Sequence, residues 1–292
     1  MPENPGMSRR KLIGLGAATV AATALPDALF RLSSAAAATG PTAGIGYFAR
    51  FGVTEKMLRD GLSAALSRGA DYADLFFQHR VGNSLALEDG EVNRASASVE
   101  LGVGVRAVKG DQTGYAYTED LTPEALVQAA KTAAAIADGP AKPGPKGLKA
   151  ESTLPARYPV KTRWEDVRPQ QKLPLLSGLN EKVFAADKRI TKVNVFFGDE
   201  AGAILIADSN GRVVEDLQPM TRLGLSCVAE QDGKKETNGY NVAGRADIGY
   251  YSPDRLERIV KEAVSRTLVL FEAVQPPAGE MPVVLGAGAS GI

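Results

Sequence analysis

The chain has 292 residues, 44% hydrophobic and 23% charged, which is typical of a globular protein with one large domain or two ordinary ones. Lys plus Arg and Asp plus Glu both total 34, so no net charge attracts nucleic acid or an anionic membrane. The single cysteine, Cys227, excludes an intrachain disulfide. With His79 as the only histidine, the sequence cannot supply the several Cys or His ligands of a typical zinc site.

The first forty residues have the features of an export signal. A basic run near the start resembles a twin-arginine signal: Ser8, Arg9, Arg10 and Lys11. The apolar stretch at 12–25 is too short for the ~20 residues that span a bilayer, and the four alanines at 35–38 suit signal-peptidase cleavage. The alternative is a buried or amphipathic helix, but the order of these features favours a signal. We predict that residues 1–40 are removed, that the mature chain has no membrane span, and that it is periplasmic or extracellular.

Residues 41–140 are predicted to form a first α+β unit. Thr54 can cap a helix that runs to about Arg68, and Pro123 begins a second helix that ends near Gly139. Between them, Asp89-Gly90 is a strong hairpin signal among alternating apolar and polar residues. The strands expected here cover residues 74–80, 83–88, 91–97, 99–107 and 113–117.

Residues 141–160 are rich in Pro, Gly and Lys and are predicted to be a linker to a second α+β unit at 161–277. This unit should begin with a helix at 170–186, disturbed by Pro174, and end with a helix that Ser252 caps. The strands expected between these helices cover residues 191–197, 203–207, 213–216, 222–230 and 236–242. Residues 278–292 then read as the first strand of a further domain.

The two units repeat one pattern, in which a turn, a long strand, a second turn, another strand and a proline-started helix follow each other. The sequence therefore predicts an α+β fold of two similar modules, each an antiparallel β-meander plus helices. In each long strand one face is bulky and the other small. The small residues are Gly102, Gly104, Gly224 and Ser226. Tight packing explains them most simply, and the alternative is the floor of a groove for an extended peptide that adds as a strand.

Other candidate residues carry weaker signals. His79 and Cys227 alternate in phase with apolar neighbours, so we expect a packed histidine and a small core residue rather than a ligand and a nucleophile. Gly286, Gly288 and Gly291 match G-x-G-x-x-G, but a dinucleotide site also needs a following helix and an acidic residue ~20 positions on. The nucleotide-binding interpretation is therefore the weakest.

Three segments resemble the TldD/PmbA (TldD/TldE) metallopeptidase family, on its TldD side: residues 71–77, residues 102–108 with 113–117 after them, and residues 277–288. The last resembles the family's approach to its metal site. The resemblance implies a zinc-dependent peptidase whose His-Glu-x-x-x-His helix would begin just after Ile292, a non-catalytic TldE/PmbA-type partner, and peptides or unfolded segments as substrates. Family members of this kind are cytoplasmic, whereas this chain carries an export signal.

No catalytic or metal-binding residue of the family can be placed on this chain. We therefore expect residues 278–292 to be the start of a truncated catalytic domain, and the chain alone to bind no zinc and cleave no peptide. The main hypothesis is the substrate-cleft and partner-binding portion of an exported TldD-like zinc peptidase. The alternatives are a non-catalytic binding or partner module of the same family and a fragment of a nucleotide-binding oxidoreductase.

Overall fold

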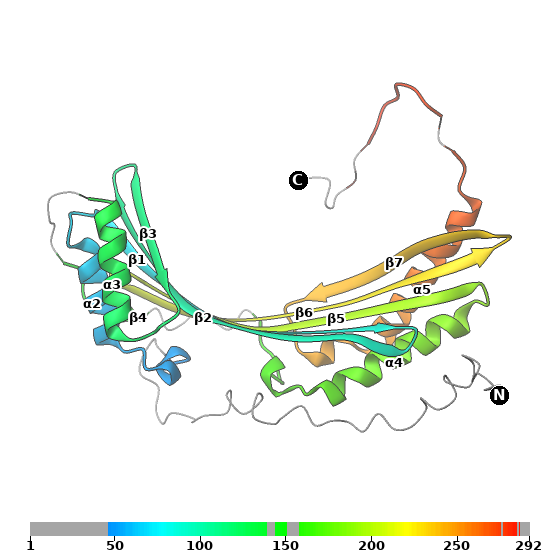
Figure 1. The fold of residues 1–292 in the computed structure, drawn as a ribbon, viewed down its shortest axis with the longest axis horizontal. Coiled ribbons are helices and arrows are strands. Elements are labelled where there is room, and N and C mark those ends of the chain that lie inside the picture. The colour runs from blue at the N-terminus through cyan, green and yellow to red at the C-terminus, as the bar shows by residue number, and fades with distance from the viewer. Residues whose placement is uncertain (1–45, 139–143, 151–157, 276, 285, 287–292) are drawn as a thin grey trace, which may run out of the picture. The chain divides into compact units, whose positions relative to one another are not determined.

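The computed structural model describes residues 46–138, 144–150, 158–275, 277–284 and 286. Its main element is a seven-stranded sheet in the order β3-β2-β1-β5-β6-β4, with β7 also pairing with β6 (Figure 1). All strand pairs are antiparallel except β4 with β6. The strands are β1 Tyr72–Glu88, β2 Glu91–Lys109, β3 Gln112–Thr118, β4 Lys149–Ala150, β5 Ile190–Asp208, β6 Arg212–Gln231 and β7 Lys234–Gly244.

The four long helices begin and end close to where the sequence predicts them: α2 Glu55–Leu66, α3 Pro123–Ile136, α4 Pro169–Ala186 and α5 Pro253–Leu268. Thr54 caps α2 by accepting a hydrogen bond from the backbone N–H of Met57, and Ser252 caps α5 by accepting one from the backbone N–H of Arg255. Helix α4 continues through Pro174 without a break. Pro174 is exposed, so water can satisfy the carbonyl that loses its helical partner there. Short 3-10 turns are η2 Phe48–Phe51, η3 Trp164–Asp166, η4 Ile248–Tyr250 and η5 Val269–Glu272.

The α+β class is confirmed, and each half of the chain has the same element order. The first half runs α2-β1-β2-β3-α3 and the second α4-β5-β6-β7-α5. The two halves share one sheet, because β1 pairs with β5 from Asp74 opposite Asp208 to Glu88 opposite Asn194. The predicted linker contributes β4, whose two residues pair with Arg212 and Val213 of β6.

The predicted breaks inside the four long strands were wrong. Residues 81–82 belong to β1, 98 to β2, 198–202 to β5 and 217–221 to β6. Glycines suggested some of these breaks, but Gly82 lies opposite Ser98 of β2 and Glu200 of β5. Ladders on both sides satisfy the backbone at such positions, and this long-range pairing overrides the local preference of glycine.

Two apolar cores lie on the same face of the sheet. Leu75 and Phe77 of β1 belong to the core under α2 and α3, and Leu85 and Leu87 of the same strand belong to the core under α4 and α5. All four have odd numbers, and alternate residues of a strand point to one face. Helices α2 and α3 contact the first half of the chain and α4 and α5 the second (Figure 1).

The predicted strand at the start of a further domain is absent from residues 277–284, which have no regular structure. Val284 is 95% exposed. These residues pair with no strand in the described part of the chain, and an unpaired strand leaves its backbone groups without partners. Among the described residues, no helix has both the length and the apolar character required to cross a membrane.

Candidate functional site

The sheet face opposite the helices carries the even-numbered side chains of the long strands. Phe76, Phe196 and Met220 on this face are 39%, 43% and 37% exposed. No described helix contributes to a core there, since both cores use the odd-numbered positions. All four predicted small residues have even numbers and lie on this open face.

The structure does not join the four small residues into one floor. Gly102 lies opposite Gln78 of β1. Gly224 lies opposite Phe196 of β5, which in turn lies opposite Ala86 of β1. Eight residues along β1 therefore separate the two sites, or ~27 Å at the usual rise per residue. Gly102 and Gly104 form one candidate site, and Gly224 and Ser226 another.

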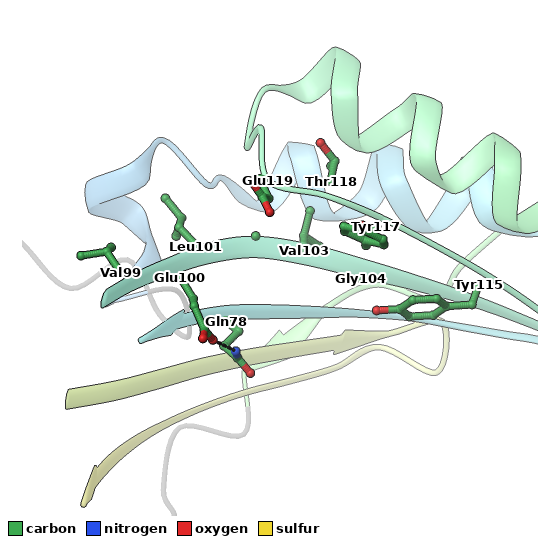
Figure 2. A pocket seen from close by; sticks show the side chains of 11 residues that line it. Gln78, Val99, Glu100, Leu101, Val103, Gly104, Tyr115, Tyr117, Thr118 and Glu119 are labelled. Carbon is green, nitrogen blue, oxygen red and sulfur yellow. Dashed lines mark hydrogen bonds between the residues drawn. The ribbon is translucent and has the colours of Figure 1, made fainter. Parts of the chain in front are cut away.

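A hollow of about 350 Å³ lies at Gly102 and Gly104, where β3 ends (Figure 2). The last residue of β3, Thr118, lies opposite Val103, and β2 continues beyond it toward Glu91. The hollow therefore lies at a step in the edge of the sheet. Its lining residues are Gln78, Val99, Glu100, Leu101, Gly102, Val103, Gly104, Tyr115, Tyr117, Thr118 and Glu119.

Neighbouring atoms lie close to both glycines. A Cβ on Gly104 would lie 2.5 Å from the Tyr115 hydroxyl oxygen, and one on Gly102 would lie 2.9 Å from the Thr118 carbonyl oxygen. The Thr118 carbonyl is backbone, so packing explains Gly102, whereas the exposed Tyr115 side chain can move away from a Cβ at position 104. At Gly224 a Cβ would meet only Asn241 at 3.5 Å, which is an ordinary contact.

The charged lining residues of the hollow are both acidic. Glu100 and Glu119 are exposed, and the Gln78 side-chain amide donates to Glu100 at 3.2 Å. Arg80 lies 3.7 Å from Glu100 but is bound more closely by Glu200. Tyr115 and Tyr117 are 58% and 71% exposed. The hollow thus combines negative charge, two exposed aromatic rings and a backbone edge.

Both predicted units are matched by models of one family. The description PmbA/TldA metallopeptidase domain 1 matches residues 73–137, and PmbA/TldA metallopeptidase central domain matches residues 162–271. The chain belongs to the TldD/PmbA family. A metalloprotease TldD homolog from Haemophilus influenzae is 35% identical over 234 residues, covering 77% of this chain and 48% of that protein. Metalloprotease PmbA from Escherichia coli O157:H7 is 23% identical, covering 68% and 46%.

Solved structures show the same fold. A putative modulator of DNA gyrase from Bacteroides thetaiotaomicron gives a TM-score of 0.59 at 18% identity, covering 73% of this chain and 49% of that one. TldE from Thermococcus kodakarensis gives 0.55 at 19%, covering 73% and 47%. This TldD/PmbA chain therefore spans about half the length of the relatives that it matches.

The residues that the structure describes do not fit the metal that the family name implies. Residues 46–138, 144–150, 158–275, 277–284 and 286 contain no group of three or more His, Cys, Asp or Glu side chains that could hold a metal ion. Cys227 is buried with its sulfur 3.2 Å from the Thr267 hydroxyl, and burial raises the pKa of its thiol, as expected for a core residue. No catalytic step through a metal can be derived from these residues.

His79 has a more specific environment than the sequence indicated. It is buried, and its Nδ1 lies 2.7 Å from the hydroxyl oxygen of Tyr47, which itself donates to Glu165 at 3.1 Å. Burial lowers the pKa of His79, and burial with the nearby Glu165 raises the pKa of Tyr47 to about 12. With Nδ1 protonated, the neutral imidazole donates to Tyr47. Tyr47 is 32 residues from His79 and 118 residues from Glu165 in the sequence, so no local pattern could have revealed this group.

A second polar group, also missed from the sequence, lies within the core under α4 and α5. Lys172 of α4 donates to Asp199 of β5 at 2.5 Å, and their side chains are 3% and 0% exposed. Asn83 of β1 donates to the other carboxylate oxygen at 3.0 Å. Burial raises the pKa of Asp199, and Lys172 and Asn83 oppose the rise. Each charge of this buried pair therefore has a hydrogen-bonding partner, which offsets the cost of burying it.

Two further predictions concern segments outside the described residues. The export-signal residues Ser8, Arg9, Arg10 and Lys11 precede the first described residue. Gly288 and Gly291 of the glycine-rich segment follow the last one. The family models, which match residues 73–137 and 162–271, give the oxidoreductase interpretation no support.

Proposed function

We propose that this chain is the N-terminal and central portion of an exported TldD-like zinc metallopeptidase that cleaves peptides or unfolded segments. Its role in that enzyme is to supply a wall of the substrate cleft and a surface for a TldE/PmbA-like subunit. The observation that carries the proposal is that two domain models of one metallopeptidase family match residues 73–137 and 162–271. The relatives that carry the name metalloprotease are about twice as long as the matched region.

The metal ligands of this enzyme are proposed to lie in polypeptide beyond Ile292. Support comes from the relatives named metalloprotease, of which this chain covers 48% and 46%. The hollow at the step between β2 and β3 supports a peptide-binding role, because an exposed strand edge can pair with an extended peptide. The balanced charge of the chain supports a partner other than nucleic acid.

The coding sequence past Ile292 and the activity of the whole gene product test this function together. We expect a His-Glu-x-x-x-His segment soon after Ile292, and chelator-sensitive hydrolysis of an unfolded protein such as reduced casein. Hydrolysis should increase when a TldE/PmbA-like homologue is co-purified. A coding sequence that ends at Ile292 would favour the alternative function, a non-catalytic binding or partner module of the same family.

Export is tested by changing the paired arginines. The double variant Arg9→Lys, Arg10→Lys keeps the positive charge but removes the twin-arginine pattern, so it should remain in the cytoplasm while the unchanged protein is recovered outside it. The matched control is Arg50→Lys, which leaves the signal intact. Equal export of the double variant would show that the protein does not use this route.

A further inference from the structure

The outer edge of β2 has a long unpaired stretch. Strand β3 covers β2 from Val103 to Lys109, and no described strand pairs with the outer side of residues 91–102. Those twelve residues extend ~40 Å at the usual rise of a strand. Residues 91–100 are all exposed. Alternate residues of this stretch direct their backbone N–H and C=O groups away from β1, where another strand can bind them.

This stretch has few of the features that normally protect a strand edge. Residues 91–102 contain no Pro and no Lys, and the register shift between β1 and β2, which leaves Asn93 of this stretch without a partner on β1, lies near the hairpin end. The side chains from Ala95 to Ser98 alternate between Ala and Ser, so they are small on both faces of the sheet. A second backbone can therefore approach β2 closely along this stretch.

The hollow lies where an added strand would meet the end of β3. Glu100 of β2 and Glu119 of the turn after β3 both line it, on opposite sides of β2 in Figure 2, and its lining residues include no basic residue. Tyr115 and Tyr117 add exposed aromatic rings to the same wall. Carboxylates attract a cation, and a nearby aromatic face attracts it further through a cation–π interaction. The chemistry of the hollow therefore fits a Lys or Arg side chain.

We propose that the β2 edge binds an extended peptide by strand addition and that the hollow between Glu100, Glu119 and Tyr115 takes a basic side chain of that peptide. This inference deepens the proposed function and rests on it, since it names the substrate class of the same cleft. A second copy of this chain is the competing occupant. In that case edge would pair with edge, and Arg94 is the basic residue within 91–102 that Glu100 of the other copy would meet.

The direct test is fluorescence anisotropy of the full chain with labelled octapeptides of alternating Ser and Val that carry one central Arg, Gln or Glu. We expect the Arg peptide to bind at least roughly tenfold more tightly than the Glu peptide, a difference of about 1.4 kcal/mol. The preference should shrink as salt is raised. Equal binding of the three peptides overturns the inference.

Two further measurements separate the basic pocket from strand addition. The double variant E100Q/E119Q should lose most of the preference for Arg, whereas the control double variant E181Q/E257Q, with exposed glutamates on helices α4 and α5 away from the β2 edge and the hollow, should keep it. Strand addition is tested with two Arg peptides, one N-methylated at the odd-numbered amides and one at the even-numbered amides. At least one of these two N-methylated registers should bind weakly, because it lacks the N–H groups that complete a ladder with β2. Preference retained in E100Q/E119Q, or full binding of both N-methylated registers, contradicts the proposal.

Two outcomes distinguish this inference from the proposed function. If the whole gene product hydrolyses casein but neither binds nor cleaves basic peptides preferentially, only the inference fails. If the chain binds basic peptides as described but the whole gene product hydrolyses nothing, only the peptidase function fails. Sedimentation velocity tests the second copy as occupant. If the chain dimerises with rising concentration and the dimer does not bind the Arg peptide, the edge belongs to a second copy and the proposal is overturned.

Discussion

The two halves of the sheet have the same element order but different interiors. The core under α2 and α3 is rich in small residues, with Ala129, Ala130 and Ala133 of α3 packed onto the strands, and its buried polar contact is the one between Tyr47 and His79. The core under α4 and α5 holds Trp164 and Phe197 together with the buried Lys172–Asp199 pair and Asn83. One topology therefore accommodates either close backbone packing or a satisfied polar network.

The largest effect that would test this comparison comes from breaking the buried ion pair. Lys172→Met leaves Asp199 buried and without its cation, which should cost about 3–5 kcal/mol of unfolding free energy. Urea denaturation at pH 7 measures the loss. The double variant Lys172→Met, Asp199→Leu should recover most of it, because no unpaired charge remains. If the single variant is as stable as the parent protein, the pair does not organise this core.

The next effect comes from the closest backbone contact of the other core. A Cβ on Gly114 of β3 would lie 1.9 Å from the carbonyl oxygen of Ala133 in α3. Gly114→Ala should therefore force α3 away from the strands and cost about 1–3 kcal/mol or more. The control Gly178→Ala, on a helix where a Cβ meets nothing within 4 Å, should be neutral or stabilising. Similar melting temperatures for the two variants would contradict the close packing.

A smaller and equal effect is expected from the helix caps of the two halves. Thr54→Ala removes the oxygen that accepts from Met57 N at the start of α2, and Ser252→Ala removes the one that accepts from Arg255 N in α5. Each should cost about 1 kcal/mol. Chemical denaturation measures both. A much larger loss from either variant would mean that its side chain does more than cap a helix.

The smallest effect that we expect is a change in pH dependence at the histidine beside the first core. Burial lowers the pKa of His79 below its value in the unfolded chain. The neutral imidazole therefore makes its full contribution to the free energy of unfolding above about pH 6.5, and this contribution is lost as the pH falls below that value. Urea midpoints should therefore fall between pH 7.5 and 5.5 more steeply in the parent protein than in His79→Gln. Equal slopes would contradict a buried neutral His79.

Other groups near His79 do not change the sign of that comparison. The charged and titratable groups facing it are Tyr47, Glu165, Arg50 and Arg163, and the pKa of Tyr47, raised to about 12, lies far above this range. Burial raises the pKa values of Asp199 and Glu215, which gives the opposite slope as pH falls. Both carboxyls are present in the two proteins compared, so the difference in slope isolates the imidazole.

Local signals predicted the features that depend on local chemistry. Thr54, Pro123 and Ser252 locate helix starts, and Asp89-Gly90 locates a hairpin turn, where Asp89 has positive φ. The lengths of the strands could not be predicted, because Gly82 is held in β1 by partners 16 and 118 residues away. Pairing across such distances leaves no periodic pattern in the sequence.

The candidate site was predicted in part. Alternation placed Gly102 and Gly104 on the small face of a long strand, and the structure places them on the open face. The step that forms the hollow was not predictable, because it depends on β3 ending opposite Val103 while β2 continues. Gly224 and Ser226 share the pattern but lie at the other end of the sheet, so an identical local signal marks two separate places.

The central claim is that the residues of this chain form a scaffold and peptide-binding edge while the metal is held by other polypeptide. The most direct measurement is the zinc content of the purified chain after incubation with equimolar zinc and gel filtration, with peptidase activity assayed on the same sample. We predict far less than one zinc per chain and no hydrolysis. One tightly bound zinc per chain, lost on changing His79 to Gln, would contradict the account.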